Sequence, residues 1–273
     1  MKLLFGRPIA EKIYQEIDLE RKKSRLKPGL TVIMIGKNRA SKIYVKLKEK
    51  IAEQLGFYFQ KYLLPTKTSE KKVSKIINKL NRDKEIQGII VQLPLPKYLD
   101  PNKIIPRILP EKDIDGFHPE TKFISPVYQA ILKLLSFYKI KIKNKKIVIL
   151  ANSLTFAQPL KKIFQKRKSQ TKIVFRSKYS HCSREYGKYL KKADILIIAL
   201  GQPKFLKGKM IKKGAAIIDV GYSRIGKKAI GDVDLNSCQK KALAISPVPG
   251  GIGPLTVAFL MKNVLLAAKK YPR

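Results

Sequence analysis

The chain has 273 residues, with 59 Lys and Arg against 19 Asp and Glu, which gives a formal net charge of +40. Its 44% hydrophobic content excludes a disordered polyelectrolyte and indicates a globular protein with a real core. The basic residues recur along almost the whole chain rather than in one arm or tail. This favours a lysine-rich solvated surface over a specific nucleic-acid interface, although such a surface also attracts small polyanionic ligands.

The cysteines Cys182 and Cys238 are far apart, and the only histidines are His118 and His181. This is the spacing of neither a disulfide framework nor a metal site, so we expect reduced cysteines and no metal. The N-terminal apolar run is too short for a signal peptide. Residues 242–261 carry no charge, but prolines and glycines interrupt them, so we expect no membrane helix and a cytoplasmic protein.

Short apolar strands alternate with amphipathic helices in the first part of the chain. In chain order we predict a strand at 30–35, a helix at about 40–55, a strand at 57–63, a helix at 70–80 and a strand at 88–91. Continuous apolar strands separated by helices indicate parallel βαβ units with both faces of the sheet covered.

The alternation pauses after Asp115-Gly116 and restarts near Lys139. The second part is predicted to contain a helix at 129–138, a strand at 146–150, a helix around 160–168, strands at 172–175, 194–199 and 215–220, and a closing helix at 254–270. We therefore predict an α/β protein of two α/β domains with a cleft between them. Ligands of open α/β sheets bind at the carboxyl ends of the strands.

Three polar side chains share one face of the first predicted helix. Ser41, Tyr44 and Lys48 are spaced i, i+3 and i+7, which places a phenol and an amine one turn apart. A lysine beside an aromatic ring and other cations has a lowered pKa, which suits acid–base chemistry. Taken alone, Lys48 is more simply one solvated lysine among many.

Two further polar groups follow the first domain's strands. Gln92 comes directly after the strand at 88–91 and is followed by two prolines, so it is placed to orient a substrate or an amine, or simply to cap the strand. Asp113 and Asp115 precede Gly116, and one of them could accept hydrogen bonds from an amino-pyrimidine ring. The alternative is an ordinary Asp-Gly turn with a packed His118.

A loop rich in glycine and proline precedes the last predicted helix. It reads Pro247-Val-Pro-Gly-Gly-Ile-Gly-Pro254. Glycines let the backbone approach a ligand closely, and a helix N-terminus favours anions, although a structural loop could use the same composition.

Together these segments resemble the methylenetetrahydrofolate dehydrogenase/cyclohydrolase family over nearly the full chain. The resemblance is carried by Ala40-Ser41-Lys-Ile-Tyr44-Val-Lys-Leu-Lys48, Gly88-Ile-Ile-Val-Gln92-Leu-Pro-Leu-Pro96, Pro110-Glu-Lys-Asp-Ile-Asp115-Gly-Phe-His118, Ala193-Asp194, Gly201-Gln-Pro203, Ile218-Asp-Val-Gly221, Gly231-Asp-Val233 and Pro247-Val-Pro-Gly-Gly-Ile-Gly-Pro254-Leu-Thr-Val-Ala258. It implies a homodimeric enzyme that oxidises 5,10-methylenetetrahydrofolate with NADP and then hydrolyses the methenyl cation to 10-formyltetrahydrofolate.

The resemblance also implies domains and residue roles. A folate-binding catalytic domain would span 1–120 and be joined by the C-terminal helix, about 257–273, while a Rossmann-like NADP-binding domain would span 121–256. Lys48 would be the catalytic base or proton relay, Gln92 would hold it, Tyr44 would stack on the folate and Asp115 would anchor the pterin. The substrate would be bound by Tyr44, Ser41, Asp115, Pro249, Gly250, Gly251 and Gly253.

The cofactor loop departs from the family pattern, which is Gly-Arg-Ser-x-x-Val-Gly-x-Pro. Both glycines are alanine here, and the implied NADP-binding residues are Ala151, Asn152, Ser153, Pro159, Arg176, Ser177, Gly201, Val220 and Gly221, with Ala157 at the second glycine position. Alanine costs little at this place if φ is negative and more if φ is positive. The basic Arg176-Ser177-Lys178, with no acidic residue, favours NADP over NAD.

Two alternatives remain open. The degenerate loop could have lost the dehydrogenase reaction, which leaves a cyclohydrolase that needs Lys48 and no hydride acceptor. In another class of function, the chain would be a non-catalytic polyanion-binding protein on this fold, with steeply salt-dependent binding to nucleic acid.

Overall fold

The structure is a computed structural model, and it describes residues 1–175, 183–226 and 228–271. The chain divides into two compact units. We call Ala10–Gln129 with Thr256–Arg273 the three-stranded unit, and Met1–Ile9 with Ala130–Leu255 the six-stranded unit. Helices α1 (Arg7–Ser24), α5 (Pro126–Phe137) and α9 (Ile252–Lys270) each begin in one unit and end in the other. Each unit is described by itself.

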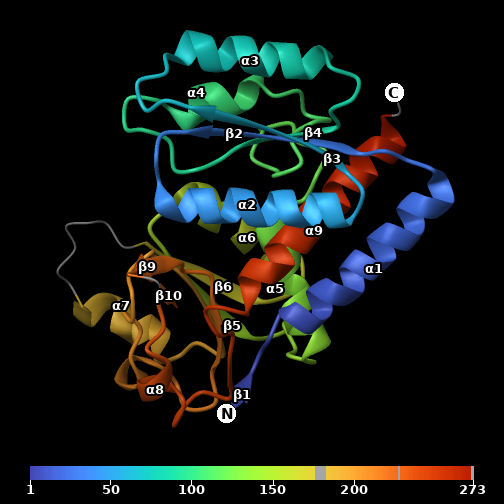
Figure 1. Cartoon of the computed structure of the whole chain (residues 1–273). Helices are drawn as coiled ribbons and strands as arrows, with labels where there is room; N and C mark the ends of the chain where they lie inside the picture. The colour runs from blue at the N-terminus through green and yellow to red at the C-terminus, as the bar shows by residue number, and fades with distance from the viewer. Residues whose placement is uncertain (176–182, 227, 272–273) are drawn as a thin grey trace. The chain divides into compact units, whose positions relative to one another are not determined.

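The three-stranded unit is built on a parallel sheet in the order β3-β2-β4. Its strands are β2 (Gly29–Ile35), β3 (Tyr58–Leu64) and β4 (Gly88–Val91). One face is covered by α2 (Arg39–Gln54), and the other by α3 (Glu70–Arg82) and α4 (Pro101–Ile104), which continues into η1 (Ile105–Arg107) (Figure 1). Because β2 is covered on both faces, all seven of its residues are buried, as its continuous apolar run predicts.

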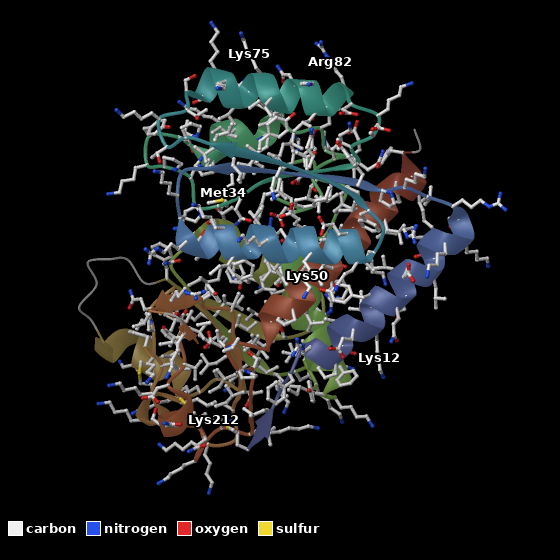
Figure 2. All side chains as sticks on the ribbon, viewed as in Figure 1. Lys12, Met34, Lys50, Lys75, Arg82 and Lys212 are labelled. Carbon is white, nitrogen blue, oxygen red and sulfur yellow. The ribbon has the colours of Figure 1, made fainter. Side chains whose placement is uncertain are left out.

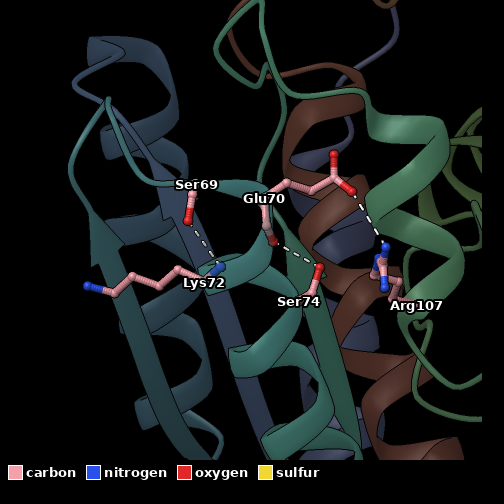
Figure 3. Close-up of polar contacts among 5 residues, drawn as sticks. All are labelled: Ser69, Glu70, Lys72, Ser74 and Arg107. Atoms are coloured by element: carbon pink, nitrogen blue, oxygen red, sulfur yellow. Dashed lines mark hydrogen bonds and ion pairs between the residues drawn. The ribbon is translucent and has the colours of Figure 1, made fainter.

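Helix α3 shows how a lysine-rich segment folds into this unit. Its buried stripe of Val73, Ile77 and Leu80 packs on Ile33 and Ile89 of the sheet. Its basic side chains, including the labelled Lys75 and Arg82, extend away from the sheet (Figure 2). At its start the Ser69 side chain accepts a hydrogen bond from Lys72 N, and the Ser74 hydroxyl donates to Glu70 O (Figure 3). The apolar stripe and the N-cap together specify the helix.

The six-stranded unit has a parallel sheet in the order β1-β11-β8-β7-β5-β6. Its strands are β1 (Lys2–Leu3), β5 (Lys146–Ala151), β6 (Gln170–Phe175), β7 (Ile195–Ala199), β8 (Ala216–Asp219) and β11 (Ala244–Ile245). The chain runs from β5 outward to β6 and then back to β7, so the strand order reverses between β5 and β7. In doubly wound sheets, that reversal point marks the ligand-binding edge.

The remaining elements of this unit are short. They are α6 (Leu154–Gln165), α7 (Ser183–Leu190), α8 (Leu235–Cys238), η2 (Gly208–Met210) and the antiparallel hairpin of β9 (Ser223–Ile225) and β10 (Lys228–Ile230). The predicted strands and most predicted helices are present, with ends that shift by a few residues. The predicted start of α6 near 160 was wrong, because Ser153 caps Phe156 N and the helix begins at Leu154.

Helix α9 is long and apolar enough to cross a membrane by composition alone. However, 67% of its most apolar window is buried inside the protein, which is the environment of a core helix. Its basic residues near the end pair with helix α1, where Lys262 lies 3.6 Å from Glu16 and Lys269 donates to Glu20.

The packing of α3 gives a direct test of this core. Ile77 is fully buried, so Ile77→Ala removes apolar contacts and leaves a cavity that destabilises the protein by about 2–5 kcal/mol. Leu63 on β3 is 60% exposed, so Leu63→Ala is the control and changes the free energy of unfolding by less than about 0.5 kcal/mol. Urea unfolding measures both, and equal effects of the two substitutions would contradict this packing.

Candidate active site

Helix α2 places Lys48 on a buried face. Asn38 caps the helix by accepting a hydrogen bond from Ser41 N at 3.0 Å. The buried residues of the helix are Ser41, Val45, Lys48 and Ala52, which recur at helical spacing. The simpler alternative of a solvated surface lysine does not hold, since Lys48 is only 9% exposed. Tyr44 lies on the same helix and is half-buried.

The Lys48 amine is held by the side chain of Gln92. Lys48 Nζ donates to Gln92 Oε1 at 2.9 Å. Gln92 follows β4, where its backbone N–H donates to Ile33 O of the neighbouring strand at 2.8 Å. Its Nε2 donates to Leu93 O at 2.8 Å, which directs Oε1 toward the amine. The structure thus brings together two residues that the sequence places 44 positions apart.

Ser41 supports the same segment rather than standing apart from it. Ser41 is only 4% exposed, and its hydroxyl donates a hydrogen bond to Leu93 O at 3.3 Å. Leu93 O therefore accepts from both Ser41 and Gln92, which ties the start of α2 to the end of β4. Ser41 helps to fix the place of Gln92.

Burial lowers the pKa of Lys48, and the nearby Asp115 carboxylate opposes this by raising it. The predicted direction is confirmed, but the predicted cause was wrong: desolvation lowers the pKa, not a ring and neighbouring cations. Burial also raises the pKa of Asp115, which the Lys48 charge lowers and the Asp113 charge raises further. An amine with a lowered pKa close to a carboxyl with a raised pKa is an arrangement suited to proton transfer.

The turn that carries Asp115 is tightly held. Asp113 is buried, and its Oδ2 accepts a hydrogen bond from His118 N at 2.7 Å. Gly116 has φ +75°, and a Cβ atom there would lie 2.7 Å from Ser125 N. The Asp-Gly turn predicted from the sequence is thus present, and it presents a half-buried Asp115 close enough to affect Lys48.

The glycine-rich loop lies in the six-stranded unit, and packing accounts for part of its composition. Gly250 has φ +107° and its carbonyl accepts a hydrogen bond from Gly6 N at 2.8 Å. Gly251 is buried, with room for no Cβ beside Pro247 O. Pro249 is exposed, and Gly250 and Gly253 are half-buried. Of the four predicted substrate contacts in this loop, Gly251 is therefore the one that is buried.

The predicted cofactor loop lies at the reversal point of the six-stranded sheet. Ala151 ends β5, Ser153 caps α6, and Asn152 Nδ2 donates to Leu200 O after β7 at 2.8 Å. Ala151 and Ala157 are fully buried, and neither has a positive φ. Their methyl groups thus face the core and occupy no ligand space, while the exposed Leu154 and Thr155 begin a helix whose N-terminus suits a phosphate. Pro159 is exposed within α6.

Two buried aspartates that the sequence analysis did not single out organise the neighbouring loops. Asp232 accepts the backbone N–H groups of Leu200, Gly201 and Gln202 at 2.6, 3.0 and 2.6 Å. Asp219 accepts those of Gly221, Asp232 and Val233 at 2.9, 3.1 and 2.9 Å. Burial raises the pKa of Asp219 to about 7. The sequence could have pointed to them, because both aspartates lie in segments that carry the family resemblance, Ile218–Gly221 and Gly231–Val233.

These aspartates explain why glycines flank them. A Cβ at Gly221 would lie 2.0 Å from the Asp232 carboxylate carbon, and one at Gly231 would lie 2.0 Å from Asp219 Oδ2. Gly201, with φ +65°, is exposed, and Val220 is half-buried. The predicted contacts Arg176 and Ser177, like Lys178, lie outside the described residues.

Comparison with known proteins assigns both parts of the chain. Residues 4–115 match the model for the tetrahydrofolate dehydrogenase/cyclohydrolase catalytic domain, and residues 125–272 match the model for its NAD(P)-binding domain. The bifunctional protein FolD of Halothermothrix orenii is 38% identical over 98% of both chains. The chain belongs to the tetrahydrofolate dehydrogenase/cyclohydrolase family.

Solved structures of this family agree with the fold. The FolD enzyme of Campylobacter jejuni, a methylenetetrahydrofolate dehydrogenase/cyclohydrolase, has a TM-score of 0.90, 33% identity and 99% coverage of both chains. The Trypanosoma brucei enzyme, solved with NADP and an inhibitor, has a TM-score of 0.90 and 31% identity, and the match covers 99% of this chain and 98% of that one. The prediction of a two-domain α/β fold with a Rossmann-like parallel sheet is confirmed.

The coupling between Asp115 and Lys48 leads to a pH prediction. Asp115 raises the pKa of Lys48, so Asp115→Asn removes that charge and lowers the pKa of Lys48 further. The change is measured by ¹³C NMR titration of the lysine Cε resonances, with Lys48 assigned from the signal that Lys48→Met removes. An unchanged or higher pKa in Asp115→Asn would show that the two groups do not interact.

Proposed function

We propose that this chain oxidises 5,10-methylenetetrahydrofolate to 5,10-methenyltetrahydrofolate with NADP and then hydrolyses the product to 10-formyltetrahydrofolate. The observation that carries the proposal is the buried Lys48 amine, hydrogen-bonded to Gln92 and coupled to Asp115, in a member of this family. Because its pKa is lowered, this amine is more readily found unprotonated, and so able to accept a proton, than a solvated lysine.

Lys48 provides the proton transfer in the hydrolytic step. Water attacks the electrophilic amidinium carbon of the methenyl cation, its oxygen forms the new bond to carbon, and its proton passes to Lys48 Nζ. The resulting ammonium returns that proton to the ring nitrogen as the carbon–nitrogen bond breaks. The hydroxyl on that carbon loses its remaining proton to solvent water at the same time, so it becomes the carbonyl of the formyl group on the other nitrogen. Gln92 orients the amine during both transfers because it accepts one of its N–H bonds.

Asp115 and Tyr44 support the placing of the folate. A carboxylate with a pKa raised by burial can accept hydrogen bonds from the amino-pyrimidine edge of the pterin, and the half-buried phenol ring of Tyr44 offers a stacking surface. Ser41 acts on the same site through Leu93 O. Pro249, Gly250 and Gly253 are proposed as further substrate contacts.

The residues of the cofactor loop fit a phosphorylated dinucleotide. The N-terminus of α6, after the Ser153 cap, offers backbone N–H groups to a phosphate. The methyl groups of Ala151 and Ala157 are buried, so they do not block a ligand at this helix terminus. Bound there, NADP would supply the hydride acceptor for the dehydrogenase reaction. Asn152, Gly201, Val220 and Gly221 line the same edge of the sheet, and Arg176 and Ser177 are proposed to favour the 2′-phosphate.

The finer assignments are proposals as well. We assign the folate domain to 1–120 with the C-terminal helix from about 257, and the NADP domain to 121–256. We also propose a cytoplasmic homodimer that binds neither nucleic acid specifically nor a membrane. The high positive charge then serves two polyanionic ligands, a polyglutamylated folate and NADP.

Replacement of Lys48 tests the central assignment. Lys48→Met removes the proton carrier, so we expect kcat for methenyltetrahydrofolate hydrolysis to fall by about 10²–10⁴-fold. The control is Lys50→Met on the same helix, whose side chain is exposed. Both reactions are followed spectrophotometrically. If Lys48→Met retained both activities, the assignment would be wrong.

The same assay on the unmodified protein separates the alternatives. Normal methenyl hydrolysis without any NADPH formation would establish a cyclohydrolase alone. Neither reaction, together with tight and steeply salt-dependent binding of nucleic acid, would establish the polyanion-binding protein.

The buried alanines give an independent test of the cofactor loop. Because Ala157 is fully buried in α6, Ala157→Gly opens no ligand space and only weakens the helix, by about 1 kcal/mol. We expect the KM for NADP to stay within about threefold of the unmodified protein, which is well under 1 kcal/mol. A marked fall in that KM on restoring glycine would show that the methyl group obstructs the cofactor.

A further inference from the structure

One polar side chain is buried deep within the apolar helix α9. Asn263 is 2% exposed, and its neighbours along the helix, including Val264 and Leu265, are fully buried apolar residues. A buried amide costs stability unless its hydrogen bonds are made inside the protein. The hydrogen-bond partners of Asn263 therefore show what this buried amide does.

The Asn263 side chain is hydrogen-bonded to the segment that carries Asp115 and its surroundings. Asn263 Nδ2 donates to Ile114 O at 2.8 Å and to Ile124 O at 3.1 Å. Its Oδ1 accepts a hydrogen bond from Gln129 Nε2 at 3.0 Å, and that same Nε2 donates to Ile124 O at 2.8 Å. One side chain on α9 thus joins two backbone positions that lie 149 and 139 residues away along the chain.

These two backbone positions flank Asp115. Ile114 is its direct neighbour in the chain. Ile124 precedes Ser125, and Gly116 packs so closely against Ser125 that a Cβ would not fit between them. Asp115 therefore lies between Ile114, which Asn263 binds directly, and Gly116, which packs against the segment that Asn263 binds at Ile124. The Ile114 side chain is also buried, 2.8 Å from where a Cβ of Gly88 would lie, so the loop has little freedom to move.

We propose that Asn263 is a positioning residue for the folate reaction, which fixes Asp115 by holding the Ile114 and Ile124 carbonyl groups. It acts through the backbone beside Asp115 rather than on the substrate itself. The C-terminal helix α9, whose residues 256–270 belong to the three-stranded unit, thereby contributes to the site through a single amide. The role of Asp115 in this inference rests on the proposed function, whereas the hydrogen bonds of Asn263 do not depend on it.

The test compares Asn263→Leu with the unmodified protein. Leucine has a similar volume, but it removes the side-chain donor to Ile114 O and leaves Ile124 O with Gln129 Nε2 alone, so Asp115 shifts from its place. We expect the KM for both folate substrates to rise about tenfold, the consequence of losing hydrogen bonds to buried groups, while kcat changes much less. The ¹³C titration is expected to show a lower pKa for Lys48, the same direction as in Asp115→Asn. Asp115 is the charged group that acts on Lys48, and Asp113 acts on Asp115 in turn.

A double-mutant cycle shows whether Asn263 acts through Asp115. In an Asp115→Asn background, we expect Asn263→Leu to add almost nothing to the KM, because the group it positions is already gone. Ile77→Ala is the control for a general loss of stability, since it leaves a cavity in the core of the same unit at a residue with no part in the site. It should lower the melting temperature without changing the KM or the Lys48 titration.

The outcomes separate this inference from the proposed function. If the unmodified protein turned over neither folate, the proposed function would fail, yet the Lys48 titration, which needs no turnover, would still decide the positioning role. If Asn263→Leu behaved like Ile77→Ala, with unchanged KM and an unchanged Lys48 pKa, the inference would be overturned. Asn263→Ala, which also removes the donor and adds no charge near Asp115, gives the same reading should the leucine variant fail to fold.

Discussion

The site depends on one constraint, the burial of the Lys48 amine beside a neutral acceptor. Gln92 satisfies an N–H bond of that amine without supplying a negative charge, so desolvation governs the pKa of Lys48 and lowers it. A carboxylate at the position of the Gln92 amide would hold the lysine charged. Asp115 is the carboxylate that does act on Lys48, and burial raises its own pKa, which weakens it as a counter-charge. The amine is thereby kept ready to exchange a proton.

The backbone around Lys48 follows from that constraint. Gln92 is oriented only because β4 ends at Val91 beside β2, where Ile33 O receives its N–H and Leu93 O receives its side-chain amide. The cofactor edge of the six-stranded unit uses charge differently. There the buried Asp219 and Asp232 each accept three backbone N–H groups, and the glycines at 221 and 231 are required because the carboxylates occupy the space of a Cβ. At positions 151 and 157 the backbone does not have a positive φ and the alanine methyl groups are accommodated in the interior, so glycine is not required there.

Much of this could be predicted from the sequence, because apolar periodicity identifies strands such as β2 and β4, and strand ends locate Gln92. Helix α1 was not predicted, since its apolar positions are diluted by charged residues over Arg7–Ser24. The start of α6 was misplaced because the proline at 159 obscured the Ser153 cap. Burial of Lys48 could not be foreseen, because one lysine among so many carries no local signal of its surroundings. The role of Asn263 depends on contacts from the other end of the chain, which periodicity cannot show.

The scarcity of acidic residues makes their placement informative. With only 19 Asp and Glu in the chain, several lie where a backbone or an amine requires a carboxylate: Asp113 holds His118 N, Asp219 and Asp232 hold strand-end loops, and Asp194 accepts Lys146 N and pairs with Lys212. The basic residues labelled on α1, α2, α3 and near η2 are instead distributed over surfaces (Figure 2). Surface lysines can accumulate at little cost to the fold, because exposed charges are solvated and screened. A buried carboxylate cannot be replaced so freely, since its loss leaves several N–H groups unpaired. The excess of basic residues is therefore compatible with the fold, whereas the few acids named here hold backbone or amine groups, and among them Asp115 is the one coupled to Lys48.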